Sequence, residues 1–313
     1  MIKTIIQPRN NGNAIITIAN GKTYEKKWND FSRVNWEEYC NKHKLGLFLV
    51  TEDLISKDDP YWKKATWQKL ILGDSILQYN TEVVNLCYID SDFLINPKAP
   101  NVFDDFQEDK ISLVSQFKNL PFDEHLIKRR ISFLRNKFYD NKYPLDSAIF
   151  MSIDDLCDYH NKPSLKDYAC AGFFIFNLKN HSKKLKELFF KYKSDIDSIT
   201  GGGDEFHFNF EIQNNLPIQW LDYKYQALWV YEMAAYYPFL YQTKNQNNID
   251  LIKSCVLTSL ENNFFLHFAG SWHESEMLLI EGIFEKSDVM KEFNDYLNQS
   301  VTGQPKGVIK PKK

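Results

Sequence analysis

Two aspartates on alternate residues, Asp90 and Asp92, stand between two apolar runs of the sequence. Residues 83–89 precede them, Ser91 separates them, and residues 93–95 follow. Two carboxylates at the end of a buried strand can hold a hard divalent cation and leave positions free for diphosphate oxygens. Asp-x-Asp also occurs often in solvated turns, but the preceding apolar run favours a metal site. We therefore predict that Asp90 and Asp92 bind a metal and that Asp90 and Ser91 lie beside a diphosphate.

His267 is a candidate for a third metal ligand. It lies in a late apolar run, residues 263–269, and Gly270 follows three positions later. Its imidazole could complete a site of two carboxylates and one nitrogen for manganese, with coordination positions left open. The alternative is a core histidine whose ring bonds the backbone. Gly270 favours the metal site, because a residue without a side chain lets the backbone approach a phosphate closely. We expect Asp90, Asp92 and His267 to converge on one Mn²⁺ or Mg²⁺ ion.

Alternating strand and helix patterns precede the aspartates and would position them. The strands are predicted at residues 14–19, 45–51 and 83–89, and the helices at residues 28–43 and 61–79. This order predicts right-handed crossovers and parallel pairing of the three strands. Ligands of open α/β sheets bind beyond the carboxyl ends of strands. Asn20, Gly21 and the two aspartates should therefore share one edge of the sheet.

Regular patterns return after a charged, helix-leaning stretch at residues 124–168. The later strands are predicted at residues 170–178 and 263–269, and the later helices at residues 182–193, 204–214 and 285–298. Residues 301–313 hold Gly, Pro and Lys, which predicts a disordered basic tail.

Composition argues against several classes of protein. Of 313 residues, 43% are hydrophobic and 15% aromatic, which is enough for a packed core. The 38 basic and 41 acidic residues give a net charge of −3, so no positive field favours nucleic acid or anionic lipid. No apolar run approaches the roughly 20 residues of a membrane span, and the first residues lack a signal-peptide core.

The five cysteines are odd in number and widely spaced. Such usage predicts free, buried thiols in a reducing compartment, here the cytoplasm, instead of disulfides or a zinc site. A substrate at a membrane would require another component to recruit the protein there.

The order of these pieces resembles the GT-A glycosyltransferases, and most closely glycosyltransferase family eight, over most of residues 14–275. The resemblance implies an α/β fold with a mixed sheet flanked by helices, and residues 1–300 as one catalytic domain. Residues 124–168 would then be a helical insertion or an acceptor-side lobe. It also implies transfer of a sugar from a nucleotide sugar, most commonly a UDP-sugar, to a carbohydrate or glycoconjugate acceptor.

The first landmarks of that family match residues before the middle of the chain. A turn after the first strand carries an aromatic residue that stacks on uracil, and here Ala19 and Asn20 form the turn and Tyr24 follows. The family has an arginine before the metal strand, where this chain offers Lys69. The metal aspartates are matched by Asp90 and Asp92.

The later landmarks match the second half of the chain. An Asn-Ala-Gly segment that opens a strand appears here as Cys170, Ala171 and Gly172. A motif that lines the donor sugar is matched by Asp204 and Glu205, with Asn209 on the same helix. The final His-x-x-Gly-x-x-Lys is echoed by His267, Gly270 and His273. Histidine replaces the lysine that grips the diphosphate, and Cys170 replaces a sugar-binding asparagine.

The resemblance implies roles for the two acids and leaves alternatives open. In a retaining enzyme, Asp204 or Glu205 would steady an oxocarbenium-like centre, whereas in an inverting enzyme one of them would deprotonate the acceptor hydroxyl. Lys69 and His273 would be further charge partners of the diphosphate. Asp204 could instead be a helix N-cap, with Glu205 as a first-turn acid.

Two other classes of protein share some of these features. A haloacid-dehalogenase-type phosphatase also places Asp-x-Asp after a buried strand, but normally after the first strand of the fold. A GT-A-like binding or scaffolding protein without catalysis is favoured by Cys170 and His273. The basic residues Lys128, Arg129 and Arg130 could contact an acidic acceptor or form a solvated helix face.

Overall fold

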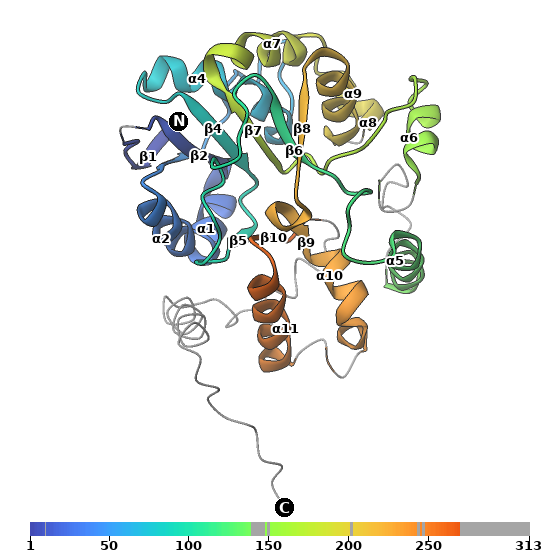
Figure 1. Cartoon of the computed structure of the whole chain (residues 1–313). Helices are drawn as coiled ribbons and strands as arrows, with labels where there is room; N and C mark the ends of the chain where they lie inside the picture. The colour runs from blue at the N-terminus through green and yellow to red at the C-terminus, as the bar shows by residue number, and fades with distance from the viewer. Residues whose placement is uncertain are drawn as a thin grey trace, which may run out of the picture.

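The computed structural model describes residues 1–9, 11–138, 148, 151–200, 203–242, 245 and 248–269, without the side chains of residues 133–138 and 197. Its strands form a seven-stranded sheet and a smaller three-stranded sheet beside it (Figure 1). The predicted Gly270, His273 and 285–298 helix, and the predicted basic tail, lie outside the described residues.

The large sheet is mixed, with the strand order β1-β3-β2-β4-β7-β6-β8. The strands are β1 (Ile2–Ile6), β2 (Asn13–Ile18), β3 (Gly46–Val50), β4 (Asn85–Ile89), β6 (Ile111–Val114), β7 (Phe173–Asn177) and β8 (Ile218–Leu221). β3, β2 and β4 pair in parallel, as the alternation of strands and helices predicts. β1 and β7 run antiparallel to β3 and β4. The predicted α/β class, with a mixed sheet and flanking helices, is confirmed.

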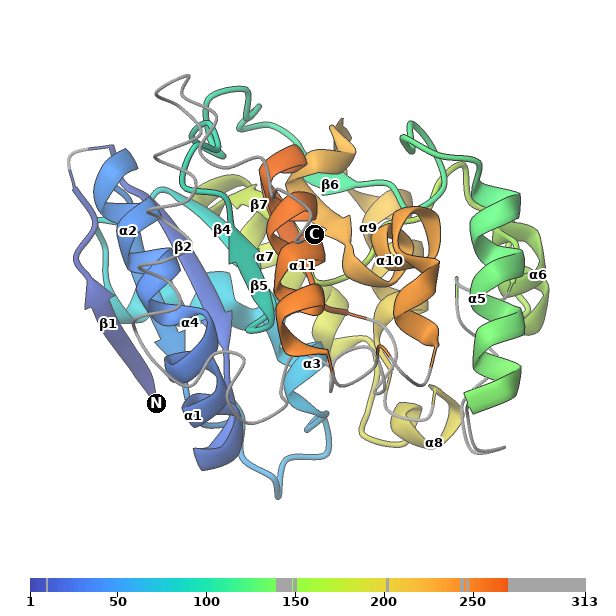
Figure 2. The same ribbon diagram turned by 90° about the horizontal axis from the view of Figure 1, so that it is seen from below.

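Helices cover both faces of this sheet (Figures 1 and 2). The helices of the described residues are α1 (Gly21–Phe31), α2 (Arg33–His43), α3 (Ala65–Gln68), η1 (Lys69–Ile71), α4 (Leu72–Tyr79), α5 (Glu124–Phe138), α6 (Ile153–Tyr159), α7 (Leu178–Phe190), α8 (Ile196–Thr200), α9 (Glu205–Asn215), η2 (Tyr223–Gln226), α10 (Trp229–Tyr236), η3 (Pro238–Tyr241) and α11 (Ile249–Asn262). Of these, α5, α6, α10 and α11 lie beside the sheet and most of the others lie nearer to it (Figures 1 and 2). Alternate strand residues face opposite layers, because side chains of a strand point to opposite faces. Ile15 packs with Trp28 and Trp36 of α1 and α2, whereas Ile16 packs with residues of α4, α7 and α9.

The small sheet joins distant parts of the chain. It has the order β5-β10-β9, with β5 at Phe93–Ile95, β10 at Phe265–His267 and β9 at Ala227–Leu228. β10 pairs antiparallel with β5, which places His267 opposite Phe93. β4 belongs to the large sheet and β5 to the small one, so the residues between them lie at the junction of the two sheets.

The structure differs from the sequence prediction mainly at element boundaries. β1 was not predicted, because an edge strand pairs on one side only and its residues here are half-buried instead of forming an apolar run. The helix predicted at 28–43 is two helices that meet at Ser32, whose side chain bonds the Ser91 carbonyl at 2.9 Å. The helix predicted at 61–79 starts at Ala65 and contains a 3₁₀ turn.

The segment at 124–168 contains helices, as predicted, and α5 packs on α10 through Ile127 and Ile131 (Figure 2). Lys128 pairs with Glu124 at 2.8 Å, and Arg130 donates to the Ala234 and Ala235 carbonyls at the end of α10. Two of the three basic side chains therefore have partners within the chain. The role of this segment in binding an acceptor stays a prediction.

Two expectations drawn from composition can be compared with the structure. All five cysteines are free and buried, as predicted. Every helix that the structure describes is too short or too polar to reach across a bilayer.

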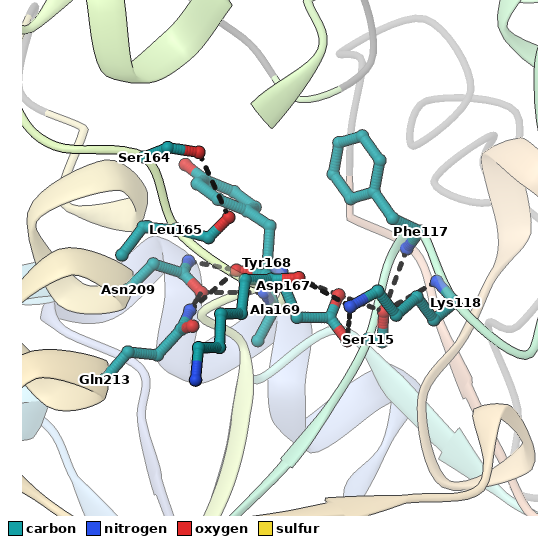
Figure 3. Close-up of polar contacts among 11 residues, drawn as sticks. Ser115, Phe117, Lys118, Ser164, Leu165, Asp167, Tyr168, Ala169, Asn209 and Gln213 are labelled. Carbon is teal, nitrogen blue, oxygen red and sulfur yellow. Dashed lines mark hydrogen bonds and ion pairs between the residues drawn. The ribbon is translucent and has the colours of Figure 1, made fainter. Parts of the chain in front are cut away.

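Asn209 of α9 holds the chain segment that enters β7 (Figure 3). Its side chain is fully buried, accepts from Ala169 N at 2.7 Å and donates to Ala169 O at 2.8 Å. Gln213, one turn later, donates to Asp167 O at 2.8 Å. The helix thus bonds the backbone as a neighbouring strand would, just before the segment that continues into Gly172.

We predict that Asn209→Ala leaves two buried backbone groups unpaired and lowers the free energy of unfolding by about 3 kcal/mol. Asn214→Ala is the matched control, because Asn214 is on the same helix but exposed. Urea denaturation of both variants measures the difference. Equal stability of the two variants would show that the Asn209 bonds contribute nothing.

Candidate metal centre

The acidic loop between β4 and β5 is held by backbone bonds from other elements. Asp90 N donates to Gly172 O at 2.9 Å, next to the pairing of β4 with β7. Phe268 N donates to Asp92 O at 3.0 Å, which continues the pairing of β10 with β5. The two aspartates are therefore fixed relative to both sheets, and their side chains remain 34% and 45% exposed.

His267 lies beside both carboxylates. Its side chain is fully buried, and Nε2 is 3.3 Å from Asp92 Oδ1 and 3.7 Å from Asp90 Oδ2. Two ligands at about 2.0–2.6 Å from one cation lie about 3 to 3.7 Å apart when they bind at right angles. One ligand atom from each of the three residues lies within 4.8 Å of the others. The predicted convergence of the three residues is thus present in the structure.

His267 Nε2 lies near both carboxylates but makes no hydrogen bond with either, which supports a ligand at this place. The atom is buried and has no hydrogen-bond partner among the described residues. A core histidine would satisfy its polar atoms, since buried polar groups are normally hydrogen-bonded. Phe93 stacks on the imidazole with ring centroids 4.0 Å apart and 17° between the ring planes, so the ring is fixed. Two carboxylates and an imidazole with an open side fit a Mn²⁺ or Mg²⁺ ion.

Tyr88 orients the first carboxylate. Its hydroxyl donates to Asp90 Oδ1, which leaves Oδ2 on the side of His267. Burial raises the pKa of Tyr88, and the neighbouring Asp90 raises it further, so the hydroxyl keeps its proton. Tyr88 was not predicted from the sequence to orient Asp90. The signal was present, because residues two apart on a strand share a face.

Gly172 gives the metal centre its space. A Cβ atom at this position would lie 2.4 Å from His267 Cε1 and 2.7 Å from Asp90 Oδ2. The residue therefore has a steric role that a larger residue could not fill. Its neighbour Ala171 is buried and accepts a hydrogen bond from Lys69 Nζ at 2.6 Å.

Lys69 and Asp204 form a buried ion pair next to the centre. Nζ is 2.8 Å from Asp204 Oδ2, and the two side chains are 2% and 9% exposed. Burial alone would lower the pKa of Lys69, but Asp204 and Asp90 outweigh it and the pKa is raised. Asp204 stands at the N-cap of α9, yet its side chain makes no cap hydrogen bond. The structure therefore does not support the helix-cap interpretation.

Glu205 follows Asp204 as the first residue of α9 and is partly exposed. Burial, together with the Asp204 charge, raises the pKa of Glu205 to about 7. The side chain of Gln116 and the backbone of Ala171 act on the same carboxylate and oppose that rise. Near neutral pH this carboxyl group can hold or release a proton. Gln116 was not predicted from the sequence, because it is not near any of the predicted site residues along the chain.

The residues predicted to hold the nucleotide lie at the same sheet edge. Ala19 is buried and its N–H bonds Val50 O, Gly21 has φ +83°, and Tyr24 of α1 is 60% exposed. Asn20 donates to Asp53, whose carboxylate also accepts from Trp62 Nε1 and Gln68 Nε2, each at 3.0 Å. Asp53 was missed, although it follows β3 at the carboxyl edge. Nucleotide binding by Ala19, Asn20 and Tyr24 stays a prediction.

No protein-family model matches the sequence, and no curated protein does. Among solved structures, a glycosyltransferase involved in the glycosylation of the major capsid of PBCV-1 aligns with a TM-score of 0.44 at 10% identity, over 85% of this chain and 100% of that one. The glycosyltransferase GlyE of Streptococcus pneumoniae TIGR4 aligns with a TM-score of 0.40 at 12% identity, over 92% of this chain and 65% of GlyE. The bifunctional glycosyltransferase WbbM aligns with a TM-score of 0.43 at 13% identity, over 90% of this chain and 51% of WbbM.

These three solved proteins are glycosyltransferases, and the chain spans 65% and 51% of the last two. The alignments are too distant to assign a function to this chain. A functional proposal therefore has to rest on the geometry of its own site.

We predict that Gly172→Ala displaces His267 and weakens Mn²⁺ binding at least about tenfold, because the added methyl overlaps the ring at a cost of about 1–3 kcal/mol. Gly203→Ala is the control, since among the described residues a Cβ there would meet only Thr200 O, at 3.5 Å. Calorimetric titration with Mn²⁺ compares the two. Unchanged affinity in Gly172→Ala would contradict a metal at this position.

Proposed function

We propose that the protein is a metal-dependent glycosyltransferase of the GT-A type, resembling family eight, that uses a UDP-sugar as donor and a carbohydrate or glycoconjugate as acceptor. The observation that carries this proposal is the convergence of Asp90, Asp92 and His267 Nε2, which has no hydrogen bond among the described residues, at the carboxyl edge of the sheet. The buried Lys69–Asp204 pair and Glu205 adjoin that convergence through Ala171. A cation held next to these groups suits the departure of a diphosphate from a sugar, because it neutralises the charge of the leaving group.

Asp90, Asp92 and His267 would hold Mn²⁺ or Mg²⁺, which would neutralise the leaving nucleoside diphosphate. Tyr88 fixes the orientation of one of these carboxylates. Burial raises the pKa of Asp204, Lys69 opposes that rise, and the ion pair holds the carboxylate where it would bind sugar hydroxyl groups. Glu205 is the acid free to exchange a proton or to face a positive centre, because it has no lysine partner of its own in the described residues.

The two stereochemical courses assign different work to Glu205. In the retaining course, which the family resemblance favours, Glu205 supplies negative charge next to the oxocarbenium-like sugar. In the inverting course it removes the proton of the acceptor hydroxyl. Both courses require the ionised carboxylate.

We predict that Asp92→Asn abolishes Mn²⁺-dependent hydrolysis of the UDP-sugar that the protein accepts. A thermal-shift screen of UDP-, GDP- and ADP-sugars with and without Mn²⁺ identifies the donor, because a bound ligand raises the apparent stability. Asp58→Asn, at an exposed carboxylate, is the control that keeps activity. Donor binding without any turnover would favour the scaffold alternative, and no shift with any donor would sink the proposal.

The pH dependence of the reaction should follow Glu205. Its pKa of about 7 means that the ionised fraction grows as the pH rises through neutrality. The rate should rise about tenfold per pH unit below 7 and level off above it. Glu205→Gln should be slow and lack that rise, whereas exposed Glu187→Gln should keep the wild-type profile. A wild-type rate that falls between pH 6 and 8 would rule out an ionised Glu205 as the active form.

A further inference from the structure

The side of His267 that faces away from the aspartates contacts Gln226 and Cys170. Gln226 Nε2 lies 3.2 Å from His267 Nδ1 and 3.2 Å from Cys170 O. Cys170 Sγ lies 3.7 Å from the same ring nitrogen. Gln226 is 2% exposed and ends η2, directly before β9, which pairs with β10. The second ring nitrogen of the candidate ligand is therefore enclosed by buried groups.

The partners of Gln226 fix which atoms donate. A backbone carbonyl can only accept, so the contact with Cys170 O requires the amide nitrogen of Gln226. The other N–H of that nitrogen faces His267 Nδ1, which must accept. The proton of the neutral ring then sits on Nε2, which lies 3.3 Å from Asp92 Oδ1 but forms no hydrogen bond with it. Gln226 Oε1 is left buried without a hydrogen-bond partner among the residues described.

A cation at the centre reverses these requirements. It binds the Nε2 lone pair, so the ring proton moves to Nδ1 and would face an N–H of Gln226. The ring cannot turn away, because Phe93 stacks on it and Gly172 adjoins its edge. The Cys170 sulfur is 3.7 Å from Nδ1, and a thiol sulfur accepts only weakly. A half-turn of the Gln226 amide would give Oε1 the Nδ1–H as partner. The same turn breaks the bond to Cys170 O, so the amide must also shift away from that carbonyl.

We propose that Gln226 is a positioning residue for the metal ligand His267, presenting its amide nitrogen to Nδ1 without a cation and its amide oxygen when a cation is bound. The inference rests on the metal centre of the proposed function, but not on glycosyl transfer. Groups that bond the far nitrogen of a metal-bound histidine set the ring orientation and the basicity of the ligand. Gln226 would do so here with a neutral amide, the role that carboxylates often take.

The first test is Mn²⁺ affinity by calorimetry. Gln226→Met removes both amide orientations at similar size and should weaken Mn²⁺ binding about 10- to 100-fold. Gln226→Glu supplies an acceptor for Nδ1–H and should stay within about threefold of the wild type or bind more tightly. Exposed Gln78→Met is the matched control and should bind as the wild type does. Wild-type affinity in Gln226→Met would overturn the proposal.

Variants made in the His267→Ala background distinguish a purely structural role of Gln226 from the positioning of His267. There Gln226→Met should cause no further loss of Mn²⁺ affinity, because the ring that it orients is gone. A further loss of the same size as in the wild-type background would contradict the positioning role. If the wild type binds Mn²⁺ but transfers no sugar from any donor, the proposed function fails while this inference remains testable.

The two orientations of the amide are read from the histidine tautomer. Long-range ¹H–¹⁵N spectra, with the His267 signals assigned by their loss in His267→Ala, should show the proton on Nε2 without metal and on Nδ1 with Mg²⁺. A proton on Nδ1 in the metal-free protein would overturn the proposed turn of the amide.

Discussion

The pairing of β10 with β5 is the interaction on which the candidate site depends. It sets His267 opposite Phe93 and brings a buried imidazole to the loop that leaves β4. Without this pairing the two aspartates would be ordinary residues of an exposed turn. The pairing is itself supported from α2, because Asn35 bonds both the N–H and the carbonyl of Ile95, and Trp36 donates to Phe93 O. Side chains of α2 thus form hydrogen bonds with the backbone of β5 at the edge that does not pair with β10.

Charge is concentrated around the segment that enters β7. Lys69, Asp204 and Glu205 are grouped about Ala171, and the aspartates adjoin Gly172. Burying a charged pair is costly, and such pairs often add little to stability. Their retention next to a space kept open by a glycine is better explained by ligand binding than by folding. The two hydrogen bonds between the Asn209 side chain and the Ala169 backbone hold the start of this segment in place.

The sequence predicted the features that follow from strand ends and strand order. Asp90, Asp92 and Asn20 follow parallel strands, so their common edge could be predicted. His267 was predicted as a ligand because Gly270 follows it and because the family that the chain resembles has a histidine there. Asp53 and Tyr88 obey the same rules and could have been found. The antiparallel direction of β7 could not, because an apolar run has no signal for its direction.

Other features depend on contacts between segments far apart in the chain. Gln226 contacts Cys170 and His267 across 56 and 41 residues, and nothing in its local sequence distinguishes it. Gln116 acts on Glu205 in the same way. Asp204 illustrates the opposite difficulty, since its local sequence predicts a helix cap equally well. The missing cap hydrogen bond and the ion pair with Lys69 decide between the two roles.

The most direct measurement of the central claim is the anomalous scattering of Mn²⁺ in crystals of the protein grown with UDP. The account predicts one strong peak within about 2.6 Å of Asp90, Asp92 and His267 Nε2, with a diphosphate oxygen on its open side. A Mn²⁺ peak elsewhere, or none beside His267 at saturating Mn²⁺, would contradict it.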